Sequence, residues 1–76
     1  MPTTTEHLVN YTWKGATRTM LVKRTITEYE KLYTIRLRKG EVMLQYYDYR
    51  WNMISILKMD YTLAQCVGEA IHEAGL

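Results

Sequence analysis

The stretch LYTIRLRKGEVMLQYY, residues 32–47, constrains the fold more than any other part of this chain. On each side of Lys39 and Gly40, apolar and polar residues alternate with the period of a β-strand. With Lys39 and Gly40 as a two-residue turn, Leu37 is expected opposite Val42, one face becomes apolar and the other mostly polar. Gly40 supplies the positive φ that such a turn needs. The pattern therefore predicts an antiparallel β-hairpin.

The stretch LVNYTWKGATRTMLV, residues 8–22, shows the same alternation and predicts a second hairpin, with its turn at Gly15 and Ala16. The segment TEYEK, residues 27–31, then leads back into the hairpin of residues 32–47. It is expected to form a simple turn or a short helical turn, because its Thr and its second Glu have capping-box spacing.

Residues 53–59 fit a buried strand, although the same letters can also open a longer helix. Asp60 and Thr62 both offer a helix start. A helix is predicted over about residues 62–74, because Thr62 and Gln65 have capping-box spacing and Gly75 stands where a C-terminal glycine is expected. Apolar residues recur there every three or four positions and form one stripe. The stripe consists of Leu63, Cys66, Val67, Ala70, Ile71 and Ala74.

These elements predict one α+β domain, an antiparallel β-meander of four to five strands with a C-terminal amphipathic helix packed on one face. The strands are expected over about residues 7–59, and residues 1–6 are expected to be a flexible tail. A single helix can cover only one face of the sheet. The covered face is expected to hold Tyr33, Ile35, Leu37, Val42, Leu44, Tyr46, Ile54 and Ile56.

The composition narrows the classes of protein. No apolar run reaches the roughly 20 residues that span a membrane, and the first ten residues do not resemble a secretory signal. Cys66 is the only cysteine, which excludes an internal disulfide, fits a reducing compartment and predicts a cytoplasmic protein. Zinc-finger sites lack ligands, and we expect no metal and no cofactor.

Catalytic chemistry finds little support in the sequence. His7 and His72 have no evident nucleophile partner, and Cys66 lies on the apolar stripe, where a thiol is usually inert. Glu69 and His72 have metal-ligand spacing, but in one copy on the exposed side of a helix. There is also no Gly-rich phosphate loop. We therefore expect a protein that is not an enzyme and has no small-molecule substrate.

The segment YYDYRW, residues 46–51, places four aromatic rings and one Arg close together. By strand parity Tyr46 points inward and Tyr47 outward, while the last three residues form the tip of a turn. The uncovered sheet face and this tip carry residue types that dominate binding hot spots. The candidate partner-binding residues are Arg36, Arg38, Met43, Tyr47, Tyr49, Arg50 and Trp51.

Charge is distributed unevenly along the chain. Residues 14–39 hold eight Lys and Arg and two Glu, a net charge of +6, whereas residues 60–76 carry a net charge of −3. The hot-spot residue types and the low net charge of +2 predict a small protein–protein interaction module that binds a protein partner or a second copy of itself as a homodimer. The alternative is a module that binds single-stranded nucleic acid with the same Arg and Tyr side chains.

Overall fold

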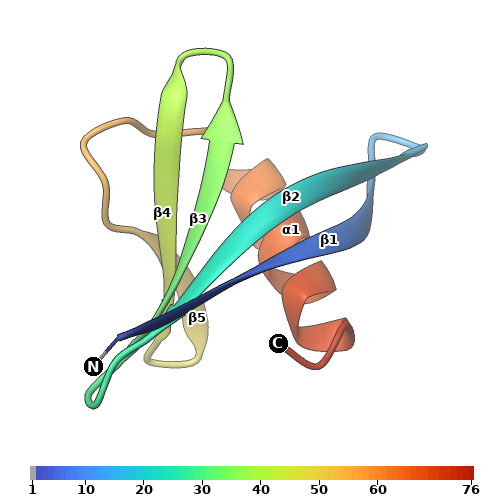
Figure 1. The fold of residues 1–76 in the computed structure, drawn as a ribbon. Helices are drawn as coiled ribbons and strands as arrows, with labels where there is room; N and C mark the ends of the chain where they lie inside the picture. The colour runs from blue at the N-terminus through green and yellow to red at the C-terminus, as the bar shows by residue number, and fades with distance from the viewer. Residues whose placement is uncertain (1) are drawn as a thin grey trace.

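The computed structural model describes residues 2–76 and forms one antiparallel sheet and one helix (Figure 1). The strands follow each other in the sheet in chain order. This arrangement confirms the predicted α+β meander with a C-terminal helix. The elements are β1 (Thr3–Trp13), β2 (Ala16–Ile26), β3 (Lys31–Leu37), β4 (Gly40–Tyr47), β5 (Arg50–Met53) and α1 (Tyr61–Glu73).

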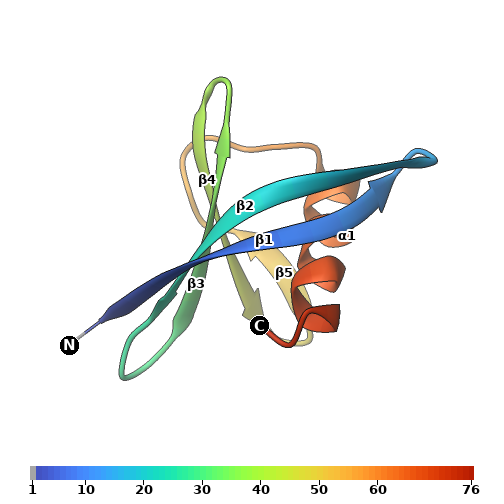
Figure 2. The same ribbon diagram turned by 45° about the vertical axis from the view of Figure 1, so that its right-hand side comes forward.

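The sheet is strongly twisted, so that the long β1–β2 hairpin crosses the β3–β4 hairpin steeply (Figures 1 and 2). The twist brings the two edge strands toward the same helix, and α1 contacts β1, β4 and β5. No described helix of residues 2–76 is long and apolar enough to cross a membrane.

The first strand begins earlier than predicted. Residues 3–6, expected as part of a flexible tail, belong to β1, and Thr3 pairs with Ile26. The hydroxyls of Thr4 and Thr25 lie 3.1 Å apart across the two strands. The first residue of the expected tail lies outside the described residues.

The first hairpin turns at Lys14 and Gly15, one residue before the predicted position, so that Trp13 pairs with Ala16. Lys14 has φ 50° and Gly15 has φ 79°. Two successive positive φ angles define a type I′ turn, whose twist matches that of the strands. A turn at Gly15 and Ala16 would instead have put a Cβ at the second positive φ.

The β3–β4 hairpin is confirmed as an element but not in its pairing. Its turn occupies residues 38–39, so Leu37 pairs with Gly40, and the predicted pairing of Leu37 with Val42 is wrong. Gly40 has the expected positive φ, 139°, and the Leu57 side chain lies 3.2 Å from the place where a Cβ would stand. Because the error is two residues, every side chain keeps its predicted face.

The segment after β5 differs from the predicted strand. The Ile54 amide donates to the Met43 carbonyl, but the next partner of β4 is the Ser55 hydroxyl, which accepts from the Met43 amide at 3.0 Å. Ser55 also donates to the Leu57 carbonyl at 2.7 Å, and the chain leaves the sheet. Ile54 is therefore half exposed and Ile56 fully exposed, although both were expected in the core.

The helix begins at Asp60, the first of the two helix starts that the sequence offers. The Asp60 carboxylate accepts from the backbone amides of Thr62 and Leu63, at 2.9 and 3.2 Å. Asp60 therefore has the capping role that was assigned to Thr62. Gln65, the expected partner in the capping box, instead donates to the Trp51 carbonyl of β5 at 2.9 Å.

The helix ends as predicted at Gly75, whose φ is 78°. The amide of Leu76 donates to the Ile71 carbonyl and that of Gly75 to the His72 carbonyl, at 3.1 and 3.0 Å, which is a Schellman motif. The Tyr33 hydroxyl donates to the Leu76 carbonyl at 3.0 Å and ties this end of the helix to β3.

The helix joins the two edges of the sheet through two successive residues. Gln65 donates to the Trp51 carbonyl on β5, and the Cys66 thiol donates to the Thr12 carbonyl on β1 at 2.7 Å. The core lies between the helix and the concave side of the sheet. It consists of Val9, Tyr11, Val22, Tyr33, Ile35, Val42, Leu44, Trp51, Met59, Ala64, Val67, Ala70 and Ile71.

Candidate functional site

The predicted partner-binding residues do not form one patch. Arg38 lies in the β3–β4 turn, whereas Tyr47 ends β4 at the opposite end of the molecule (Figure 1). Arg36 is exposed near the first end, and Met43 is half-buried midway along β4. The basic and the aromatic parts of the predicted surface are therefore separated by the length of a strand.

Trp51 was expected at an exposed turn, and this placement is wrong. Trp51 lies in β5 and pairs with Tyr46 of β4. It faces the core and is only 4% exposed. Its ring lies 5.2 Å from that of Tyr33, 5.3 Å from that of Tyr46 and 4.9 Å from that of His72, measured between centroids. The indole N–H has no hydrogen-bond partner among the described residues. Trp51 is therefore a core residue that packs against these three rings, and it is not part of the exposed surface.

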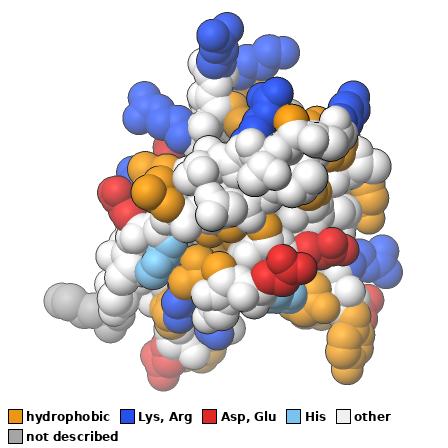
Figure 3. Space-filling view, turned by 90° about the vertical axis from the view of Figure 1, so that its right-hand side faces the viewer, with side chains coloured by type: hydrophobic (Ala, Val, Ile, Leu, Met, Phe, Trp, Pro, Cys, Tyr) orange, Lys and Arg blue, Asp and Glu red, His pale blue; other side chains and the backbone are white. Residues whose placement is uncertain are grey.

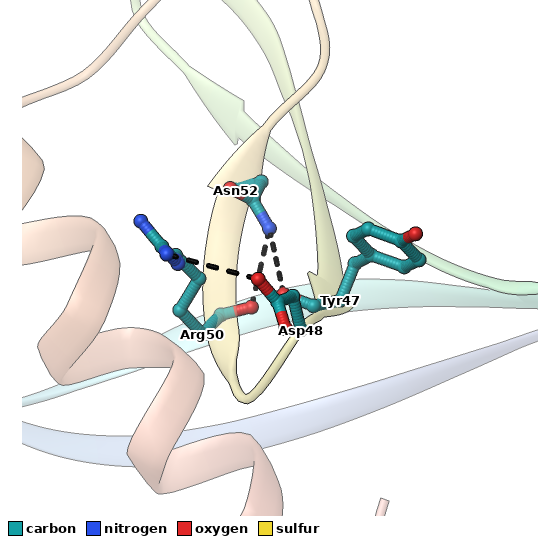
Figure 4. A network of polar contacts seen from close by, with 4 residues as sticks. All are labelled: Tyr47, Asp48, Arg50 and Asn52. Atoms are coloured by element: carbon teal, nitrogen blue, oxygen red, sulfur yellow. Dashed lines mark hydrogen bonds and ion pairs between the residues drawn. The ribbon is translucent and has the colours of Figure 1, made fainter.

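The β4–β5 turn is organised by its own side chains (Figure 4). The Asn52 amide donates to the carbonyls of Tyr47 and Arg50, both at 3.2 Å. Arg50 also lies 3.8 Å from the Asp48 carboxylate, an exposed ion pair of little energetic weight. The Tyr47 ring points away from this network and is 72% exposed.

Tyr49 has an unusual backbone conformation. Asp48 and Tyr49 form the turn with φ 56° and 62°, and neither residue is Gly. A residue with a Cβ loses roughly 1–2 kcal/mol in the left-handed region. The Tyr49 ring is 92% exposed, so packing within this chain does not compensate for that cost. An outlier of this kind is typical of a functional position.

A cleft of about 490 Å³ opens beside this turn, between the β2–β3 connection, β4 and the end of α1. Five of its lining residues have aromatic or imidazole rings, namely Tyr29, Tyr33, Tyr46, Tyr47 and His72. Glu28, Glu30 and Lys31 supply its charges. Sequence reasoning missed this cleft, because it is formed by three segments that are far apart in the chain.

Specific contacts hold the walls of the cleft. The Tyr46 and His72 rings meet edge to face, with centroids 4.5 Å apart. The Gln45 amide donates to the Glu30 carboxylate at 2.8 Å and fastens the β2–β3 connection to β4. That connection is a turn rather than a helix, because the Thr27 amide donates to the Glu30 carbonyl at 2.9 Å and residues 27–30 contain no helical turn.

Tyr33 lines the cleft, and Arg24 is its cross-strand neighbour on β2. Burial raises the pKa of the Tyr33 phenol, and the nearby Arg24 guanidinium opposes this shift. Arg24 pairs directly with Tyr33 in a continuous ladder, not at the bulge or sheet edge that its charge suggests. The Nε atom of Arg24 is buried and has no partner among residues 2–76.

A second, smaller cavity of about 320 Å³ lies between β1 and α1. It contains Cys66, Glu69 and Glu73, but the Cys66 thiol is half-buried and already donates to the Thr12 carbonyl. The described part of the chain has no group of three or more His, Cys, Asp or Glu that could hold a metal ion. This cavity therefore offers less chemistry than the tyrosine-lined cleft.

No protein family, curated protein or solved structure significantly matches this chain.

Proposed function

We propose that this protein is a non-enzymatic protein–protein interaction module. Its contact surface, called the tyrosine end below, comprises the cleft together with Tyr47, Tyr49 and Arg50. The proposal rests mainly on Tyr49. Its ring is 92% exposed beside the cleft, and its backbone adopts an unfavourable positive φ of 62°. Exposed Tyr and Arg around a pocket are the residue types that anchor partners.

The tyrosine end is suited to a partner segment that carries a basic side chain. The aromatic rings of the cleft can hold a cation over their faces, and Glu28 and Glu30 supply negative charge beside them. Lys31 lowers this negative charge but does not cancel it. The partner is a different protein or a second copy of this chain, and the single half-buried cysteine suits a reducing cytoplasm.

Binding of single-stranded nucleic acid is the second candidate, and the charge distribution supports it less. Stacking on the tyrosines would bring phosphates close to Glu28, Glu30 and Asp48. Most Lys and Arg side chains in Figure 3 lie toward the upper part of the molecule, where the β3–β4 hairpin ends. On this face a strand of nucleic acid would therefore find most cations away from the stacking rings, and among residues 2–76 only Lys31 and Arg50 are at the tyrosine end itself.

Affinity capture from a lysate of the producing cell, with and without nuclease, tests the proposal. We expect a protein that survives nuclease and is lost with the double variant Tyr47→Ala/Tyr49→Ala. Tyr61→Ala is the matched control, because Tyr61 is an exposed tyrosine at the start of α1, away from the cleft. Equal capture by the two variants contradicts the proposed surface.

Salt dependence separates the two candidates. The affinity of a nucleic-acid complex falls by roughly 0.7 log unit per log unit of salt for each neutralised phosphate, and Arg36→Gln/Arg38→Gln flattens that slope. A protein partner anchored on rings is expected to show weak salt dependence and little response to this variant. A steep slope with a single-stranded oligonucleotide overturns the choice.

A further inference from the structure

The geometry of the β1–β2 turn determines which backbone groups of β1 point away from β2. In a two-residue hairpin the residues that flank the turn, here Trp13 and Ala16, exchange hydrogen bonds, and the pairs beyond them alternate. The even-numbered residues of β1 therefore direct their backbone N–H and C=O groups away from β2. The Thr12 carbonyl fits this alternation, because it accepts from the Cys66 thiol on the side opposite β2.

The helix occupies only one end of this edge. Beyond Thr12, the edge-facing backbone groups belong to Asn10, Leu8, Glu6 and Thr4, which are all exposed residues. Proteins usually protect such an edge with Pro, Lys, a bulge or a covering segment. Residues 3–11 contain neither Pro nor Lys, and their ladder with β2 has no bulge. This stretch is a regular and accessible template for another strand.

An apolar pair lies directly beside the free edge. Leu8 is 74% exposed and pairs with Leu21, which is 45% exposed, on the face that α1 does not cover. By the alternation above they form a non-hydrogen-bonded pair, in which side chains lie closest together. Two adjacent exposed leucines at the edge of a sheet favour burial by a partner strand.

We infer that β1 pairs in antiparallel fashion with β1 of a second copy, across a two-fold axis at Leu8. This dimer rests on the proposed interaction function, specifies the second copy as a partner, and uses a surface separate from the tyrosine end. Leu8 then faces Leu8 of the other copy, and both Leu21 side chains extend the same row. Four leucines form one continuous apolar strip across a ten-stranded sheet.

Charge and hydrogen bonding select this register. An axis at Glu6 would put two carboxylates opposite each other, and an axis at His7 would put Glu6 against Leu8. With the axis at Leu8, Glu6 faces Asn10 of the other copy. The Asn10 side-chain oxygen accepts from the Thr19 hydroxyl at 2.7 Å, so its NH₂ group is turned to donate to the Glu6 carboxylate.

Disulfide trapping tests the register in a Cys66→Ser background, which keeps a donor to the Thr12 carbonyl. A hydrogen-bonded antiparallel pair has Cα atoms about 5.5 Å apart, within disulfide reach. Leu8→Cys is therefore expected to form a covalent dimer rapidly under mild oxidation. Glu6→Cys is the matched control, because the two copies of residue 6 lie about 13 Å apart along the strands. Faster cross-linking through residue 6 overturns the register.

A second variant tests the pairing of β1 with a second copy without introducing a disulfide. Glu6→Pro removes an N–H that points away from β2, so the hairpin keeps its own ladder while pairing between copies is blocked. By sedimentation we expect twice the 9.1 kDa chain mass for the native protein and a folded monomer for the variant. A native protein that stays monomeric at high micromolar concentration overturns the inference.

The two proposals fail separately. Tyr47→Ala/Tyr49→Ala is expected to remain dimeric while it loses the captured protein, because neither residue lies on β1. If Leu8→Cys does not cross-link but capture still depends on the tyrosines, the dimer is wrong and the proposed function stands. The opposite result, a β1 dimer without tyrosine-dependent capture, contradicts only the proposed role of the tyrosine end.

Discussion

The indole of Trp51 lies directly on the backbone of Gly68. A Cβ at residue 68 would stand 2.4 Å from Cγ and Cδ1 of that ring, far inside van der Waals contact. Only a residue without a side chain lets α1 approach β5 this closely. The same approach brings Gln65 within hydrogen-bond distance of the Trp51 carbonyl.

Gly68→Ala is expected to destabilise the protein although Ala is the better helix former. Forcing a methyl group against the indole costs about 1–3 kcal/mol, and the gain in helix propensity returns up to about 1 kcal/mol. We expect a net loss in the free energy of unfolding, measured by urea denaturation. Replacing Trp51 with Leu in the same chain makes room for the methyl group, so the penalty of Gly68→Ala shrinks in that background. An unchanged penalty contradicts the contact.

Tyr49→Gly is expected to stabilise the fold and weaken partner binding. Gly adopts the observed φ of 62° without the steric cost, which is worth about 1 kcal/mol. The gain appears as a higher midpoint in urea. Tyr61→Gly, at a position in the helix, serves as the control and is expected to be neutral or destabilising. Lower stability of Tyr49→Gly implies that the exposed ring has a packing role in the fold.

Cys66 is expected to react with a thiol reagent much more slowly in the native protein than in denaturant. The thiol is half-buried and donates to the Thr12 carbonyl at 2.7 Å. Leu8→Cys in the Cys66→Ser background provides an exposed reference thiol, read under conditions that dissociate copies. Equal native rates for the two thiols are inconsistent with a helix that covers β1 at Thr12.

Acid is expected to weaken the N-terminus of α1 through Asp60. Hydrogen bonds from Thr62 and Leu63 hold the pKa of the Asp60 carboxyl below its usual value. The carboxylate therefore stabilises the folded state above pH of about 4, and this contribution is lost as the pH falls through the lower folded pKa. Asp60→Asn keeps a capping oxygen but cannot titrate, so its thermal midpoint is expected to change less between pH 5 and pH 3. Identical pH profiles contradict this role.

Strand parity made most of this fold predictable, because alternation assigns each side chain to a face. It does not distinguish registers that differ by two residues, and both predicted hairpins were displaced by that amount. A turn at residues 38–39 keeps Leu37 on the predicted face while changing its partner. The faces of β3 and β4 were therefore predicted correctly and their pairings were not.

The candidate site was less predictable, because its shape depends on long-range contacts. A turn at Asp48 and Tyr49 has positive φ at two non-Gly residues, so no local pattern predicts it. That turn sets the parity of β5, and Trp51 therefore enters the core. The cleft joins β2–β3, β4 and α1, so its tyrosines could be recognised in composition but not as one surface.

The bridging of both sheet edges by Gln65 and Cys66 has a consequence for the order of folding. The helix can complete these contacts only after β1 and β5, some forty residues apart in the chain, are both in place. Closing so long a loop favours late docking of the helix, since local hairpins form with less loss of entropy. Substitutions at Gln65 and Cys66 should therefore accelerate unfolding while leaving the refolding rate nearly unchanged. The contacts that α1 makes with both sheet edges then determine how long the folded protein persists.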